Sequence, residues 1–132
     1  MAGQMGMREV RIVLRLAFAA AAIAVIVLSL LPRSSLPSVG VSDKYEHLAA
    51  YAVLAASAWL AFPSRRAALW FMLLLPLMSI ALEFAQTLVP GRSGEVADAL
   101  VSSLGAYLLL VPMLLCNGAV PFVRARRQED SS

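Results

Sequence analysis

The residues that could do chemistry in this chain fall into three groups, and each group is spaced as one face of a helix. The three stripes are Asp43, His47 and Tyr51; Ser79, Glu83 and Gln86; and Asp98, Ser102 and Gly105. A histidine near a carboxylate can bind a ligand or move a proton, which makes His47 and Glu83 the candidate catalytic residues. Lys44 and Arg92 carry the positive charge that would hold an anionic head group.

Other chemistries have less support in these residues. Ser79 or Ser102 could be a nucleophile with His47 as its base, but nothing in the sequence marks either serine as activated. Because His47 is the only histidine, the two-histidine zinc motifs and lipid phosphatases that use two histidines are excluded. Cys116 is the only cysteine, so neither an internal disulfide nor a Cys/His metal cluster can form. We therefore expect no metal and no cofactor.

The composition indicates what kind of scaffold positions these residues. Of 132 residues, 61% are hydrophobic and 14% are charged, and the mean hydropathy is +0.79. An ordinary soluble domain is about 45–50% apolar and about 25% charged, so a water-soluble domain and a disordered chain are both excluded. The net charge of +3 does not indicate a nucleic-acid partner, because the basic residues form short clusters between apolar runs.

Four long apolar runs account for this composition, at residues 16–31, 48–62, 67–89 and 96–123. A membrane-spanning helix needs roughly 17–25 residues. The third and fourth runs reach this length, the first does so if Arg15 extends its charge to the interface, and the second only if its helix begins near Asp43. The runs do not alternate as barrel strands do. The sequence predicts an all-α membrane protein with a bundle of four transmembrane helices.

The basic residues predict how this bundle lies in the membrane. With the N-terminus inside, eight arginines face the cytoplasm: Arg8, Arg11, Arg15, Arg65, Arg66, Arg124, Arg126 and Arg127. Three basic residues face outward: Arg33, Lys44 and Arg92. This bias places both termini in the cytoplasm, with residues 1–15 as a cytoplasmic flank, 16–116 as the membrane domain and 117–132 as a cytoplasmic tail. The three polar stripes are then expected to line one pocket that opens outward.

Glu83 is the most unusual residue of this expected pocket. It lies seven residues before Pro90, which is roughly 10 Å of helix at ~1.5 Å per residue. A carboxylate at that depth needs a partner or takes up a proton. The candidate partners are His47, Arg92 and Lys44, and an arginine would form the strongest pair because it can make two hydrogen bonds at once.

Structural roles remain open for the same residues. Lys44, Glu46 and Glu95 are typical of helix caps and interface anchors, and Asp98 could serve as a cap or first-turn residue. His47 and Glu83 could form a polar clasp that only joins two helices. Tyr51, Trp59 and Trp70 could each pack in the core or lie in an interface belt. The belt is favoured for the two tryptophans.

Two segments, residues 43–55 and 83–106, resemble the VanZ-like family of small bacterial membrane proteins. In that family an Asp-Lys pair precedes a His and a Tyr, a Glu is followed by a Gln, an Arg follows a Pro-Gly turn, and an Asp opens the last helix. The matching residues here are Asp43, Lys44, His47, Tyr51, Glu83, Gln86, Arg92 and Asp98. The resemblance spans residues 43–109. The chain departs from the pattern at Ser102, where the family often has Asn, and at Leu109, where it often has a second Gly.

The resemblance implies a protein of the bacterial cytoplasmic (inner) membrane that acts in the cell envelope. The family is named for a protein linked to low-level resistance to teicoplanin, a glycopeptide that binds cell-wall precursors outside the membrane. The resemblance further implies that the eight matching residues and Ser102 bind an envelope amphiphile. The partner would be membrane lipid, a lipid-linked precursor or a glycopeptide-type ligand. The alternatives are a small proton-coupled multidrug transporter that uses Glu83, or a structural or assembly protein. The ligand, any catalysed reaction and the oligomeric state stay open.

Overall fold

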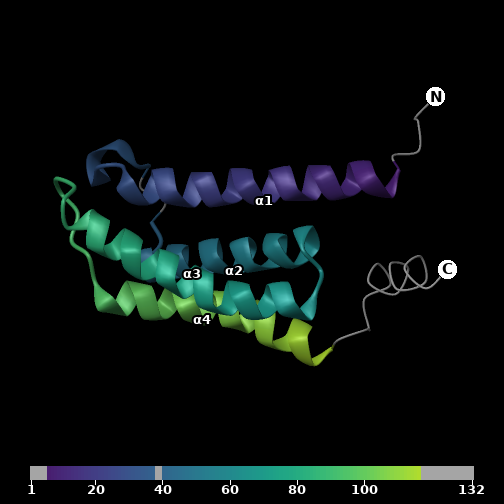
Figure 1. Cartoon of the computed structure of the whole chain (residues 1–132). Helices are drawn as coiled ribbons and strands as arrows, with labels where there is room; N and C mark the ends of the chain where they lie inside the picture. The colour runs from purple at the N-terminus through teal and green to yellow at the C-terminus, as the bar shows by residue number, and fades with distance from the viewer. Residues whose placement is uncertain (1–5, 38–39, 117–132) are drawn as a thin grey trace.

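The computed structural model describes residues 6–37 and 40–116. Within these residues the chain forms four α-helices and one short 3-10 helix, with no strand. They are α1 (Met7–Leu30), η1 (Arg33–Ser35), α2 (Asp43–Ala61), α3 (Arg65–Gln86) and α4 (Val96–Leu115). For the part of the chain that is described, the all-α prediction is confirmed. Figure 1 shows the helices lying side by side along one direction.

Local sequence signals explain where the helices begin and end. At the start of α1, the Glu9 carboxylate accepts a hydrogen bond of 3.0 Å from the backbone N–H of Gly6, and Pro32 follows its end. Ser64 caps α3, since its hydroxyl accepts a hydrogen bond from the backbone N–H of Ala67. After α3 the chain turns at Gly91, whose φ of 76° suits a residue without a Cβ.

Three helices, α1, α3 and α4, are long and apolar enough to cross a membrane, with 24, 22 and 20 residues. Helix α2 has 19 residues and does not meet the same criterion among the described helices. The reason is its first turn, which carries Asp43, Lys44, Glu46 and His47. Helix α2 does begin at Asp43, the start that the sequence required for this segment to span a membrane.

The buried core lies where α2 packs between the other helices. Helix α2 contacts α1, α3 and α4 and supplies several of the core side chains, which are Tyr51, Leu54, Ala55 and Trp59. Trp59 is only 4% exposed, so its prediction as an interface-belt residue is wrong: its side chain packs in the helix core. Trp70 is 54% exposed, as a belt residue would be.

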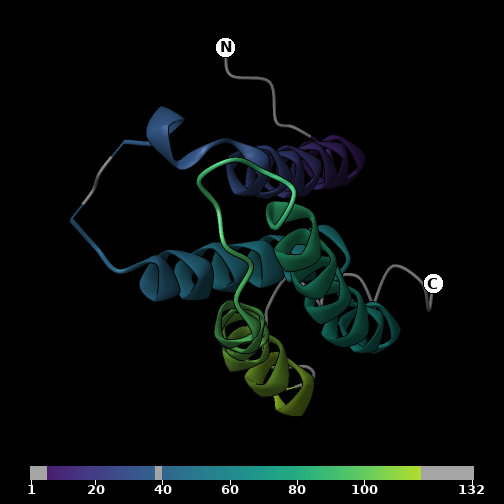
Figure 2. The same ribbon diagram turned by 90° about the vertical axis from the view of Figure 1, so that its left-hand side faces the viewer.

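Helix α1 lies at the edge of the bundle and contains no buried residue. It contacts α2 and α3, and Figures 1 and 2 show it on the outer side of both. Near its middle, Phe18 makes edge-on contacts with Phe62 and Phe71, at centroid distances of 5.8 and 5.2 Å. The guanidinium of Arg15 lies over the Phe62 ring. These contacts attach α1 at one level of the bundle.

Two glycines allow close approach of backbones near the polar end. A Cβ added at Gly105 would lie 2.3 Å from the Leu48 carbonyl oxygen, so α2 and α4 cross with no room for a side chain at this position. A Cβ added at Gly94 would lie 2.2 Å from the Glu83 carbonyl oxygen. Both approaches hold α4 and the α3–α4 loop tightly against the helices that carry His47 and Glu83.

Candidate functional site

The polar residues come together at one end of the bundle. The C-terminal ends of α1 and α3 and the N-terminal ends of α2 and α4 meet there (Figure 1). From this end, Figure 2 shows the loop between α3 and α4 passing across toward α1 before it returns to α4. The end therefore collects residues from all four helices and from this loop.

At the centre of this end, His47 of α2 faces three polar residues of α3 and α4. Its Nδ1 lies 3.1 Å from the Ser102 hydroxyl oxygen and 3.8 Å from Glu83 Oε1. Its Nε2 lies 3.9 Å from Asp98 Oδ2. Glu83 and Asp98 are each 7% exposed and Ser102 is fully buried. The structure thus brings residues of all three predicted stripes into a single cluster: one from each of the first two and two from the third.

Glu83 obtains its hydrogen bond from the backbone. The amide N–H of Glu95 donates to Glu83 Oε2 at 2.9 Å, while Oε1 faces His47. The strongest of its expected partners, Arg92, does not pair with it in the described structure. The α3–α4 loop folds back over the end of α3, which gives the carboxylate an amide donor that no side-chain pattern reveals.

Arg92 and Gln86 instead bind the C-terminal end of α1. Arg92 donates from Nε to the Leu31 carbonyl oxygen at 3.0 Å and from Nη2 to that of Leu28 at 2.9 Å. Gln86 donates to the Ser29 carbonyl oxygen at 3.0 Å. The last carbonyl groups of a helix have no hydrogen-bond donor within the helix. At the end of α1, Arg92 and Gln86 supply the donors. Both residues therefore have a structural role in addition to any contact with a ligand.

Three ion pairs, made by Lys44 and Arg33, border the cluster at its exposed side. Lys44 Nζ lies 3.4 Å from Glu95 Oε2 and 3.6 Å from Asp98 Oδ1. Asp43 pairs with Arg33 of η1, and this hydrogen bond raises the pKa of Arg33 above its ordinary value. Sequence reasoning used Arg33 only as a topology signal and Glu95 only as an anchor. Their partners are ten and 51 residues away, so helical spacing could not have found them.

Tyr51 and Ser79 lie deeper in the bundle. Tyr51 is 2% exposed and packs in the hydrophobic core, and it also lines the larger cavity described below. Ser79 is buried, and its hydroxyl has no hydrogen-bond partner among the described residues. Ser102 is also fully buried and lines neither cavity described below, so its contact with His47 positions the imidazole and leaves the serine without access to a substrate.

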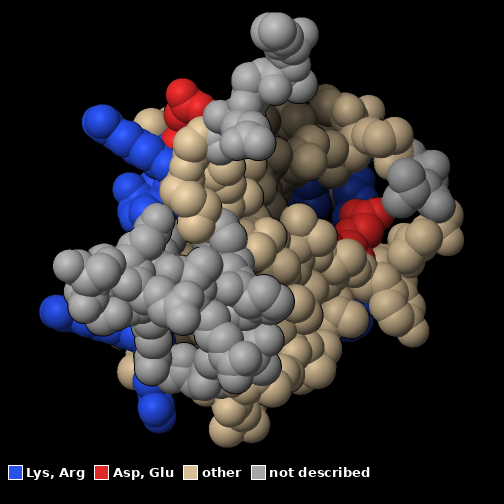
Figure 3. All heavy atoms as spheres, turned by 90° about the vertical axis from the view of Figure 1, so that its right-hand side faces the viewer, with Lys and Arg blue, Asp and Glu red and all other residues tan. Residues whose placement is uncertain are grey.

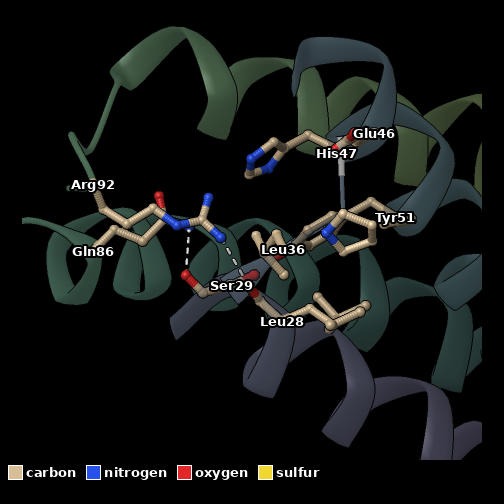
Figure 4. Close-up of a pocket in the computed structure, with 11 residues that line it drawn as sticks. Leu28, Ser29, Leu36, Glu46, His47, Tyr51, Gln86 and Arg92 are labelled. Atoms are coloured by element: carbon tan, nitrogen blue, oxygen red, sulfur yellow. Dashed lines mark hydrogen bonds between the residues drawn. The ribbon is translucent and has the colours of Figure 1, made fainter. Parts of the chain in front are cut away.

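Two cavities meet at this end of the bundle. The larger, about 430 Å³, has mainly apolar walls from α1, α2 and the segment after η1, including Val25, Leu28, Leu36, Pro37 and Ala50. The smaller, about 240 Å³, has polar walls that include Arg33, Asp43, Ser93, Glu95 and Asp98. His47, Gln86 and Arg92 line both. Figure 4 shows the His47 ring and the Arg92 guanidinium directed toward the same space, and Figure 3 shows a hollow with charged side chains at its far end.

Comparison with known proteins decides the family. The family model described as VanZ/LLP1 matches residues 8–117. The chain belongs to the VanZ/LLP1 family. The match confirms the family indicated by residues 43–109 and extends it over α1. No curated protein and no solved structure matches the chain.

In this VanZ/LLP1 protein, Ser102 stands where the family resemblance leads one to expect Asn. Its hydroxyl still reaches His47 at 3.1 Å. Leu109, which replaces a second expected Gly, does not prevent the close helix crossing, because Gly105 already provides it against Leu48. Both departures from the family pattern are therefore accommodated within the same helix arrangement.

Proposed function

We propose that this VanZ/LLP1 protein binds an envelope amphiphile, with the acyl chain in the larger cavity and the polar head group in the smaller one. The observation that carries the proposal is that His47, Gln86 and Arg92 line both cavities, so that the two adjoin. An apolar chamber beside a polar one matches the division of an amphiphile into a tail and a head. A ligand that was polar or apolar throughout would fit only one of them.

The proposal includes a membrane arrangement in which all four helices span. Helix α2 crosses the bilayer with its charged first turn at the surface, since its remaining residues are apolar and it packs between three other helices. We propose that the end carrying His47 faces outward and that both termini are cytoplasmic, in the bacterial cytoplasmic membrane. Arg124, Arg126 and Arg127, which contribute to this orientation, lie outside the described residues, as does the proposed cytoplasmic tail at 117–132.

The groups around the polar cavity suit an anionic head group only in part. Lys44 is held by Glu95 and Asp98, and Arg33 is held by Asp43. Arg92 has five N–H donors, and the structure uses its Nε and one Nη2 proton on α1. Arg33 and Arg92 each keep three donors, but of the three cations Arg92 is the one whose charge has no carboxylate partner among the described residues; it is therefore the best placed to hold a phosphate or carboxylate, and His47 supplies a neighbouring donor or acceptor. This places the head group between Arg92 and His47.

A pair of tryptophan variants on α2 tests the binding proposal. Ala50 lines the larger cavity, whereas its neighbour Ala49 is exposed and does not. We expect Ala50→Trp to fill the cavity and weaken binding of a fluorescent dioleoyl phosphatidylglycerol at least tenfold in detergent micelles, and Ala49→Trp to bind as the wild type does. Equal binding by both variants would contradict an acyl site at Ala50, and equal loss would indicate general damage to the helix.

The same site is the one we propose for teicoplanin-type resistance, which the family resemblance implies. Cells expressing the wild-type chain are expected to tolerate more teicoplanin, and His47→Ala, Glu83→Ala and Ala50→Trp to lose this tolerance at unchanged membrane levels. Loss of the protein from the membrane in all three would favour a purely structural role. Unchanged tolerance with all three would remove the link between this site and resistance.

A further inference from the structure

The cluster around His47 has the composition of a metal site. One ligand atom each from His47, Glu83 and Asp98 can be chosen so that all three lie within 4.8 Å of one another. The three residues come from α2, α3 and α4, and both carboxylates are buried. Sequence patterns gave no indication of this set, because a single histidine with two carboxylates on separate helices has no characteristic spacing.

We propose that His47, Glu83 and Asp98 bind one divalent transition-metal ion of the zinc type. Two carboxylates with 7% exposure each are costly to bury in charged form without a strong positive partner. Asp98 Oδ1 is buried and makes no hydrogen bond with any described residue; the cation nearest to it is the half-exposed Lys44, at 3.6 Å. One imidazole and two carboxylates form a mixed nitrogen and oxygen set that suits zinc-type ions better than calcium or magnesium, which prefer oxygen alone.

Neighbouring groups hold the three ligands in place. The Ser102 hydroxyl contacts His47 Nδ1 at 3.1 Å, which leaves Nε2, the nitrogen nearer Asp98, to bind a metal. The Glu95 amide holds Glu83 Oε2 and leaves Oε1 on the side of His47. A histidine that binds a metal through one nitrogen is usually held by a hydrogen bond at the other. Ser102 and the Glu95 amide are therefore positioning groups for this site.

The ligand atoms must move closer together to share one ion. Ligands about 2.1 Å from a tetrahedral zinc ion lie about 3.4 Å apart; His47 Nε2 lies 3.9 Å from Asp98 Oδ2, and the ligand atoms of the three residues lie within 4.8 Å of one another. His47 and Asp98 also line the polar cavity of about 240 Å³. An ion at the cluster can thus enter from that cavity and keep at least one coordination position open toward it.

The side chains around the cluster carry an excess of negative charge, which favours an added cation. Glu83, Asp98 and Glu95 are three carboxylates within the contacts described above, and Lys44 is the cation that lies close to two of them. Lys44 is half exposed, so solvent screens its attraction for Asp98. A bound divalent ion would balance both buried ligands directly. Metal binding is measured on the protein alone, so this inference does not rest on the proposed amphiphile.

Metal titration of the full-length protein tests the site. The protein is purified in detergent through a tag free of histidine and cysteine, treated with a chelator, and titrated with Co²⁺ while its visible absorption is recorded. We expect one equivalent to bind and to be displaced by one equivalent of Zn²⁺. We expect His47→Gln, Glu83→Gln and Asp98→Asn each to weaken Co²⁺ binding at least tenfold, and Ser102→Ala to weaken it 10- to 100-fold.

Glu46→Gln is the matched control, because Glu46 is an exposed carboxylate next to His47 but not one of the three ligands. It is expected to bind Co²⁺ as the wild type does. The wild-type result decides the matter even if the ligand variants misfold: a helical, monodisperse wild-type protein that takes up no stoichiometric Co²⁺ or Zn²⁺ overturns the proposal. Equal weakening by Glu46→Gln would also overturn it, since binding would then reflect general negative charge.

Discussion

Arg92 and Glu83 show how single residues organise the polar end of the bundle. The sequence offered Arg92 as one of three candidate partners of Glu83, and as the one that would form the strongest pair. In the structure, Arg92 binds carbonyl oxygens of α1 and Glu83 binds a backbone amide. Backbone groups are present at every residue, so a sequence pattern does not reveal which of them lack a partner. This is why the approach of His47 to Glu83 was predictable and the backbone partners of Glu83 and Arg92 were not.

The role of Arg92 leads to a prediction about stability. Arg92→Gln removes two charge-assisted hydrogen bonds to α1, and we expect it to lower the free energy of unfolding by about 1–3 kcal/mol. Thermal unfolding in detergent measures this change, and amide hydrogen exchange should quicken at residues 28–31. Arg65→Gln is the control, since Arg65 is exposed at the other end of the bundle. Equal melting temperatures for the two variants would show that the α1 contacts add nothing.

At the scale of helices, the apolar runs predicted most of the fold. Long uncharged runs have few alternatives to spanning helices, so the positions of α1, α3 and α4 follow from composition. The start of α2 at Asp43 was also anticipated. The burial of Trp59 was not, because a tryptophan near a helix end fits both an interface belt and a core. Only the packing of α2 between its neighbours distinguishes the two.

The crossing of α2 and α4 at Gly105 gives the prediction at this scale. A Cβ at Gly105 would meet the Leu48 carbonyl oxygen, and a backbone group does not move aside as a flexible side chain would. We expect Gly105→Ala to destabilise the protein by about 1–3 kcal/mol and to weaken Co²⁺ binding, since His47 and Ser102 lie on the two helices forced apart. Ala97→Gly, at an exposed position of α4, controls for a change in helix propensity.

Denaturant unfolding and the Co²⁺ titration measure the two effects of Gly105→Ala. A variant that keeps wild-type stability would mean that the helices separate there at no cost. Reduced stability with intact Co²⁺ binding would mean that the crossing and the metal cluster are independent of each other.

For the whole molecule, orientation in the membrane is the feature on which the proposed function depends. Arg8, Arg11, Arg65 and Arg66 lie at one end of the bundle, and this concentration of positive charge favours that end as the cytoplasmic end. We expect a reporter fused after Ser132 to read cytoplasmic, and a cysteine introduced at Ser93 in the polar cavity to react with a membrane-impermeant thiol reagent in intact cells. A Cys116→Ser background removes the native thiol. An external reporter together with a protected Ser93 position would reverse the proposed orientation.

The way α1 is fastened sets a limit on what can lie beside it. Phe18 fixes the helix at one level, and Arg92 and Gln86 fix it near Ser29 and Leu31 at another. Between these attachments, Val25, Leu28 and Ser29 form one wall of the larger cavity. The free stretch from Phe18 to Ser29 is roughly 16 Å of helix. The two attachments thus limit how far α1 can move away from α2 and α3, and with it the width of the larger cavity along this wall.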